Sequence, residues 1–373
     1  MVILYALIFW TCWNHFNNVL TDEMIEDGVP LLIQFVIFLV FYAIVHYSSI
    51  ILHEFGHLFF GLKSKLEFIA FNIRGVSIVR KNKKIIVEKN PLIRDIGGYC
   101  RMRFLDSINY SNKDVILYFY GGIIVNIVLS LIFLFIFLIF ENDYIRFLSL
   151  LFVIYNFYLA IYNSIPYCNL VGVNTDMRHI VNYLHDNKYV KKIGIIEKIM
   201  KYREDNNSLR SIDKNLLYMP KKFVSDYDFM LAEIYIAYLS EIKDYKKMND
   251  SIDYVLKNAR DTINEAHKNS FKVQQIDYMI HTKIDKTRLN EIWDSSFNNY
   301  INQMTILSIS GLSLKYLYYK TIENDENKSN DILNQVQNRK RKCNDMQDIQ
   351  EAEQFIQDID KCLRKDKNEK KER

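Results

Sequence analysis

The first 62 residues contain no lysine or arginine, although the chain has 48 such residues and ends in a densely charged tail. Half of all residues are hydrophobic and 14% are aromatic, which is high for a soluble protein. The formal net charge is only +4, and no basic stripe with interleaved aromatic residues occurs. These features argue against a nucleic-acid partner and favour contact of the N-terminal half with lipid.

Two further absences concern redox state and processing. The five cysteines are scattered and form no CxxC pair, which indicates free thiols in a reducing compartment. Residues 2–20 are mostly apolar but are interrupted by Asn14, His15, Asn17 and Asn18, and they lack the basic start and the small-residue cleavage site of a signal peptide. We therefore expect this segment to be a retained first membrane span.

Three long runs without Lys, Arg, Asp or Glu follow, at 29–52, 115–140 and 147–168. Each exceeds the roughly 18 apolar residues that a membrane helix needs. The segment between the first two runs, 63–113, carries twelve basic and four acidic residues. By the positive-inside rule this segment and the C-terminal part lie in the cytoplasm. We expect an integral membrane protein.

The remaining segments predict one small sheet and a helical region. Residues 66–102 are rich in Ile, Val and Phe and predict a small sheet or hairpin against the membrane. Beyond residue 177 the pattern is polar and helical, and 229–258 predicts two amphipathic helices joined near Lys243.

The expected fold class is therefore a mainly α, polytopic membrane protein. It has three core transmembrane helices plus an N-terminal span, a small membrane-associated β segment and a soluble α-helical C-terminal domain. We predict three units along the chain. These are a first span with an acidic external loop (1–28), a membrane core (29–180) and a cytoplasmic helical domain with a charged tail (181–373).

The sequence HEFGH, from His53 to His57, stands at the end of the first long run. On a helix the two histidines lie four residues apart and share a face, so both can reach one ion. Glu54 is placed to take a proton from a water molecule bound to zinc. Zinc lowers the pKa of such a water molecule to about 7. The alternative is two histidines at a helix end beside a glutamate that reaches the headgroups. Ionisable groups in a membrane helix are costly, which favours the metal site.

Two histidines need a third ligand, and the topology places the end of the third run at the same membrane depth. Pro166 breaks the helix there, and Asp176 is the only carboxylate between Arg146 and Asp186. His179 is the rival ligand. A further alternative for Asp176 is the cap of a helix that begins near Met177.

At this point the chain resembles the site-2 protease family of intramembrane zinc metalloproteases. Four matches over residues 29–180 carry the resemblance: HExxH at His53–His57, NxxP at Asn163–Pro166, GGY from Gly97, and YGGIIVN with Gly122 and Asn126. Three departures stand beside them. Ile123 replaces the usual proline, and Met177 replaces the glycine that usually follows the aspartate. Asp176 also lies farther from Pro166 in the sequence than in the commonest form of the family.

The resemblance implies one zinc ion per chain, held by His53, His57 and Asp176, with Glu54 as general base. It also implies that Asn163 and the strand segment at Gly97 and Gly98 contact the substrate backbone. By the same resemblance Gly122, Asn126 and Pro166 are structural residues near the site.

The main hypothesis is thus a bacterial-type intramembrane zinc endopeptidase in the cell membrane of a bacterium, with its active site toward the cytoplasm. Its partners are a membrane-embedded protein or peptide substrate, the lipid bilayer, and a protein partner at the C-terminal helices. The alternative is a catalytically inactive membrane scaffold that binds partners through those helices, and the missing glycine after Asp176 keeps it open. A third hypothesis is a metal-binding membrane protein without proteolysis.

Overall fold

The structure is a computed structural model. It describes residues 10, 13, 30–81, 84–89, 97–105, 108, 110–168, 173–186, 188–206, 208–259, 262–341 and 346–371. The predicted first span, 2–20, lies outside the described residues apart from Trp10 and Trp13, and so does the acidic loop 21–28.

Three helices are long and apolar enough to cross a membrane: α2 (Leu31–Lys63), α3 (Asn112–Ile139) and α4 (Asp143–Ser164). Local signals set their ends. Ser111 and Asp114 form a capping box at the start of α3, and the Asn142 side chain caps α4. The sequence predicted the third run to continue to residue 168, but α4 ends earlier. Pro166 has no N–H group and disfavours helical geometry at Ile165.

The predicted β segment is a four-stranded antiparallel sheet. Its strands are β1 (Glu67–Ile73), β2 (Val76–Lys81), β3 (Lys84–Lys89) and β4 (Gly98–Arg103), in the order β3-β2-β1-β4. Arg74 and Gly75 join β1 to β2 with positive φ angles of 45° and 82°, the geometry of a tight hairpin turn. β1 and β4 pack against α2, so the sheet lies beside the end of the first membrane helix.

The regular secondary structure in the described part of the C-terminal half is helical. Its α-helices are α5 (Asp176–His185), α6 (Tyr189–Asn206), α7 (Asp226–Glu241), α8 (Tyr245–Asn258), α9 (Glu265–His281), α10 (Lys286–Ile292), α11 (Ser295–Leu307), α12 (Ser310–Tyr318), α13 (Glu326–Lys340) and α14 (Met346–Lys371). The expected break between two helices near Lys243 is the turn between α7 and α8, where Lys243 has a φ of 63°.

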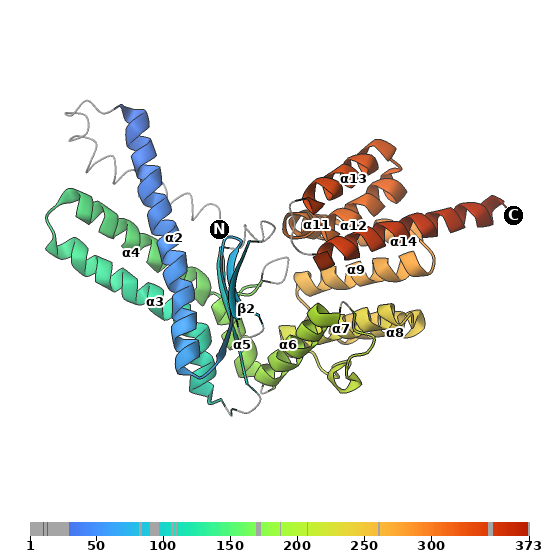
Figure 1. The fold of residues 1–373 in the computed structure, drawn as a ribbon, viewed down its shortest axis with the longest axis horizontal. Helices are drawn as coiled ribbons and strands as arrows, with labels where there is room; N and C mark the ends of the chain where they lie inside the picture. The colour runs from blue at the N-terminus through green and yellow to red at the C-terminus, as the bar shows by residue number, and fades with distance from the viewer. Residues whose placement is uncertain are drawn as a thin grey trace.

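Figure 1 shows the membrane helices on one side of the sheet and the C-terminal helices on the other. Separate apolar cores hold α6–α9 and α9–α14, while a third core joins the sheet to α3, α5 and α6. α5 thus connects the membrane core to the helical region, and it crosses the boundary predicted at residue 180. The mainly helical fold with three candidate spans and one small sheet confirms the predicted fold class.

His281, the last residue of α9, lies between two carboxylates. Its Nδ1 is 3.2 Å from Asp277 Oδ1, and its Nε2 is 3.6 Å from Asp358 Oδ2 in α14. The hydrogen bond to Asp277 is the main cause that raises the pKa of His281 to about 9. The charged imidazole therefore contributes stability in full below the unfolded pKa of about 6.5, and this contribution is lost as the pH rises through about 9.

We expect His281→Gln to remove this pH dependence. Between about pH 7 and pH 10 the free energy of unfolding should fall further in the wild type than in the variant. The difference should be on the order of 1 kcal/mol, because water reaches the ion pairs. Chemical denaturation of the full-length protein, followed by circular dichroism at several pH values, measures it. Parallel pH profiles for the two proteins would contradict the prediction.

Candidate metal centre

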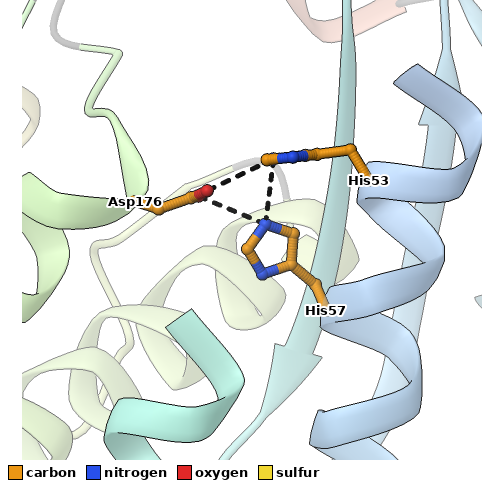
Figure 2. A group of neighbouring side chains, drawn as sticks. All are labelled: His53, His57 and Asp176. Carbon is orange, nitrogen blue, oxygen red and sulfur yellow. Dashed lines mark hydrogen bonds and ion pairs between the residues drawn. The ribbon is translucent and has the colours of Figure 1, made fainter. Parts of the chain in front are cut away.

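The motif HEFGH lies inside α2 and is buried. His53, Glu54 and His57 are each only 6% exposed. The four-residue spacing puts both imidazoles on one face of the helix, and their ring centroids lie 5.0 Å apart. The His53 and His57 Nε2 atoms are 3.3 Å from each other. The two rings therefore point at a common place beside the helix (Figure 2).

Asp176 reaches the same place from the first position of α5. Both of its carboxylate oxygens face the histidines: Oδ2 is 3.2 Å from His53 Nε2, and Oδ1 is 3.2 Å from His57 Nε2 (Figure 2). The N-cap of α5 is Thr175 rather than Asp176. The carboxylate is therefore not the helix cap that the alternative interpretation expected.

The junction between α4 and α5 explains how Asp176 arrives there. After Pro166 ends α4, the Thr175 hydroxyl donates to the Ile165 carbonyl at 2.6 Å and accepts from the Tyr167 N–H at 3.1 Å. The Thr175 N–H donates to the Tyr167 carbonyl at 3.0 Å. These bonds satisfy backbone groups that the broken helix frees, and they tie the residue before Asp176 to the end of the membrane helix.

The three donor atoms fit a tetrahedral zinc ion. A tetrahedral ion with bonds of about 2.0–2.1 Å needs neighbouring donor atoms about 3.3 Å apart. The Nε2–Nε2 distance of 3.3 Å matches one edge of such a tetrahedron, and one carboxylate oxygen lies 3.2 Å from each Nε2 atom, Oδ2 from that of His53 and Oδ1 from that of His57. Among the described residues, His53, His57 and Asp176 form the one group of three or more such side chains that could hold a metal ion.

Hydrogen bonds at the far side of each imidazole set its tautomer. His57 Nδ1 lies 2.8 Å from the Tyr118 carbonyl oxygen, which can only accept, so this nitrogen carries the proton. His53 Nδ1 lies 2.9 Å from Asn126 Oδ1. When each imidazole is neutral, its Nε2 atom therefore carries the lone pair and faces the carboxylate, as a metal-ligating imidazole requires.

The carboxylate itself is ionised. Burial alone would raise the pKa of Asp176, but the positive charges of His57 and His53 in their protonated forms outweigh this effect and hold the pKa well below its usual range. Asp176 Oδ2 is buried and accepts no hydrogen bond from the described residues. Two imidazoles and one ionised carboxylate thus converge, an arrangement whose negative charge a bound cation offsets.

Glu54 lies between the histidine face and the edge of the sheet. The backbone N–H of Cys100 donates a hydrogen bond to the Glu54 carboxylate. Gly98 makes this approach possible, because a Cβ atom there would lie 2.9 Å from Glu54 Oε1. A side chain at position 98 would therefore displace Glu54.

A cavity of about 780 Å³ opens onto these groups. Its lining includes all three candidate ligands, Glu54, and the residues that the resemblance assigned to the substrate backbone: Asn163, Gly97 and Gly98. Pro166 acts more indirectly, because it ends α4 just before the junction. The cavity wall also contains Tyr227 and Met230 from α7, and Gln303 and Ile306 from α11. Nothing in their sequence pattern had indicated this role for the C-terminal helices.

Glycines allow α2 and α3 to approach each other at the site. A Cβ atom at Gly56 would collide with the Gly121 carbonyl, and one at Gly121 would collide with the Gly56 carbonyl. A Cβ atom at Gly122 would overlap the His53 ring. Gly122 and Asn126, one helical turn apart, therefore contact the same imidazole from α3. The Tyr118 carbonyl completes this support, and it could not be found in the sequence because every residue has a carbonyl group.

His179, the rival ligand, lines the cavity but is engaged elsewhere. Its Nδ1 lies 2.8 Å from the Tyr189 hydroxyl, and its ring stacks on Phe119 with centroids 4.9 Å apart. Burial lowers the pKa of His179 to about 4, so the ring is neutral at pH 7. The geometry therefore favours Asp176 over His179 as the third ligand.

Comparison with known families gives one match. The model of Peptidase family M50 matches residues 41–313, which include every candidate site residue and most of the C-terminal helices. The comparison with curated proteins found no match, and neither did the comparison with solved structures.

We expect the purified full-length protein to hold about one zinc ion per chain. Asp176→Ala should weaken zinc binding by more than about 100-fold, beyond the loss expected for an outer-shell partner. His179→Ala, which also shortens a side chain at the cavity, should keep the zinc. Elemental analysis after dialysis against a weak chelator makes the comparison. Zinc kept by Asp176→Ala and lost from His179→Ala would reverse the assignment.

A second expectation concerns Gly122→Ala. The added methyl group must displace the His53 ring from its hydrogen bond to Asn126, so zinc affinity should fall about 10- to 100-fold. Gly97→Ala is the matched control, because a Cβ atom there meets its nearest neighbour, Ile50 Cδ1, at an ordinary 3.8 Å. Competition with a chelating dye gives both affinities. Equal affinities of the two variants would show that the ring has room to move.

Proposed function

Because this chain belongs to peptidase family M50, the site-2 protease family of zinc metalloproteases, we propose that it cleaves a membrane-embedded segment of a protein or peptide. The scissile bond lies near the cytoplasmic face of the membrane, where α2 ends. The single observation that carries this proposal is the convergence of the His53 and His57 Nε2 atoms and the Asp176 carboxylate at the end of a membrane helix. One zinc ion per chain fits these donors.

The chemistry divides between the ion and the side chains around it. Zinc, when bound, lowers the pKa of water and polarises a carbonyl group. Glu54 accepts a proton from the attacking water as the C–O bond forms, and it returns a proton to the amine that leaves as the C–N bond breaks. Asn126 and the Tyr118 carbonyl accept from Nδ1 of the two imidazoles and so favour the tautomer in which Nε2 is available to bind a metal ion.

The substrate must present an extended backbone, because a membrane helix buries its peptide bonds in its own hydrogen bonds. β4 is an edge strand of the sheet, and its first residue, Gly98, lines the cavity beside Glu54. An unwound segment can pair with such an edge through backbone hydrogen bonds. Asn163 lines the same cavity from the end of α4 and is placed to contact the backbone of the bound segment.

The protein is an integral membrane protein with three candidate spans. We place the site toward the cytoplasm of a bacterial cell because the segment 63–113 is strongly basic. The helices α7 and α11 contribute to the cavity wall, which supports a role of the C-terminal region in recruiting the substrate or a regulatory protein.

The inactive scaffold is the less favoured function. It depended on the missing glycine after Asp176, where Met177 stands. The Asp176 carboxylate nevertheless lies 3.2 Å from each imidazole. A chain that had lost catalysis would have no need to keep this donor set together with a buried Glu54.

We expect Glu54→Gln to keep zinc and lose cleavage. Glutamine has the same shape but cannot accept the proton, so cleavage should fall by about 100- to 10,000-fold. Membrane-protein fragments from cells that express the wild type or the variant can be compared by mass spectrometry of new N-termini. Fragments that depend on Glu54 identify substrates.

Glu67→Gln is the control for this experiment. Glu67 is a half-buried carboxylate on β1 that pairs with Arg80 and Arg103 outside the cavity. This variant should produce the same fragments as the wild type. An identical fragment pattern from the wild type, Glu54→Gln and Glu67→Gln, with zinc bound in all three, would refute the proposed protease.

A further inference from the structure

The buried carboxylate of Asp226 connects α5, the helix of the third ligand, to the C-terminal helices. Asp226 is the first residue of α7 and is only 4% exposed. Arg178 in α5 binds it at two points, with Nε to Oδ2 and Nη2 to Oδ1 both at 3.0 Å. Three asparagine side-chain amides also donate to it, at 2.5–3.3 Å: Asn182, Asn174 and Asn264.

Residues that contact Asp226 stand on both sides of the third ligand, Asp176, in the sequence. Asn174 lies two residues before Asp176, and Arg178 lies two residues after it. Thr175 is bound to the end of α4 through the Ile165 carbonyl. The backbone that carries Asp176 is therefore held on one side by the membrane helix and on the other by the Asp226 carboxylate.

Asp226 is placed to hold other groups rather than an ion. It lines the cavity, but both of its oxygens already accept hydrogen bonds from N–H donors. Burial would raise the pKa of Asp226, but the hydrogen bonds from Arg178 and Asn182 outweigh it and hold the pKa below its usual range. A two-point arginine–carboxylate pair of this kind adds orientation as well as energy.

A second buried ion cluster holds the other end of α5. Lys192 Nζ lies 2.5 Å from Asp186 Oδ2, at the end of α5, and 2.6 Å from Asp228 Oδ1 in α7. The Ser225 hydroxyl, just before α7, donates to Asp186 at 2.9 Å. The start of α7 thus contacts α5 at both ends, and α5 cannot rotate without breaking buried ion pairs.

We propose that Asp226 is a positioning residue of the metal centre, through which the C-terminal helices hold the Asp176 carboxylate in line with His53 and His57. This inference rests on the proposed zinc site but concerns a residue 50 positions away from its third ligand. Without the Asp226 carboxylate, α5 keeps its sequence but loses the contacts on either side of Asp176. The ligand is then free to turn away, and the site binds metal more weakly.

The test is the zinc affinity of the full-length Asp226→Asn protein, measured by competition with a chelating dye. Asparagine keeps the size of the side chain but leaves Arg178 without its charge partner. We expect zinc to bind about 10- to 100-fold more weakly, as for outer-shell partners of metal ligands. Amide hydrogen exchange in the metal-free protein should become faster across α5.

The matched control is Asp294→Asn, the same chemical change at the start of α11. Asp294 caps that helix and pairs with Lys272 at 2.6 Å, and neither residue lines the cavity. Its zinc affinity should equal that of the wild type. A double variant with Arg178→Gln should lose no more affinity than Asp226→Asn alone, because the two residues act as one unit.

The possible results distinguish the positioning role of Asp226 from the proposed protease function. Zinc affinity within about twofold of the wild type in Asp226→Asn would overturn the positioning role and leave the protease intact. A wild-type protein without zinc affinity would overturn both. If Asp226→Asn does not fold, Arg178→Lys keeps the charge and removes the two-point geometry. It should then show at least a tenfold loss, and unchanged affinity would overturn the proposal.

Discussion

The convergence of two imidazoles and one ionised carboxylate on a single point is the constraint around which the membrane core is built. His53 and His57 donate from Nδ1 to fixed acceptors, so both Nε2 atoms face the Asp176 carboxylate. A cation bound at this point offsets the charge of the carboxylate and the cost of placing ionisable groups in a membrane helix. The glycine contacts between α2 and α3 follow from the same need, because they bring Asn126 and the Tyr118 carbonyl within reach.

The second requirement is an irregular backbone close to the membrane. A carboxylate from a later segment can reach the histidines only if α4 stops near their depth, and Pro166 stops it. Groups freed there are costly in an apolar setting unless each finds a partner. Thr175 supplies several of these bonds at once, which places the following residue, Asp176, at the start of α5. The end of α4 at Pro166 and the position of the third ligand, Asp176, are therefore one structural feature.

The C-terminal helices belong to the same feature. The helix α7 binds α5 through Asp226 at one end, and through Asp228 and the α6 residue Lys192 at the other. Side chains of α7 and α11 also form part of the cavity wall. The family match likewise extends to residue 313, far beyond the membrane helices. The helical region therefore contributes to the geometry of the site as well as to its surroundings.

The sequence by itself determined the elements and the reactive groups. Three patterns are local: the apolar runs that are long enough to cross a membrane, the strand-favouring residues after Lys63, and the spacing of the two histidines in HEFGH. Such patterns can be recognised in the sequence because burial and helix geometry act on neighbouring residues. Asp176 was predictable because the topology leaves one carboxylate at the right depth. Beyond Gly122 and Asn126, which the family motif indicated, only the tertiary structure decided which groups support those ligands. Asp226 lies 50 residues from Asp176, and the Tyr118 carbonyl is chemically like any other. No local pattern marks such partners, because the path of the whole chain determines which distant groups meet.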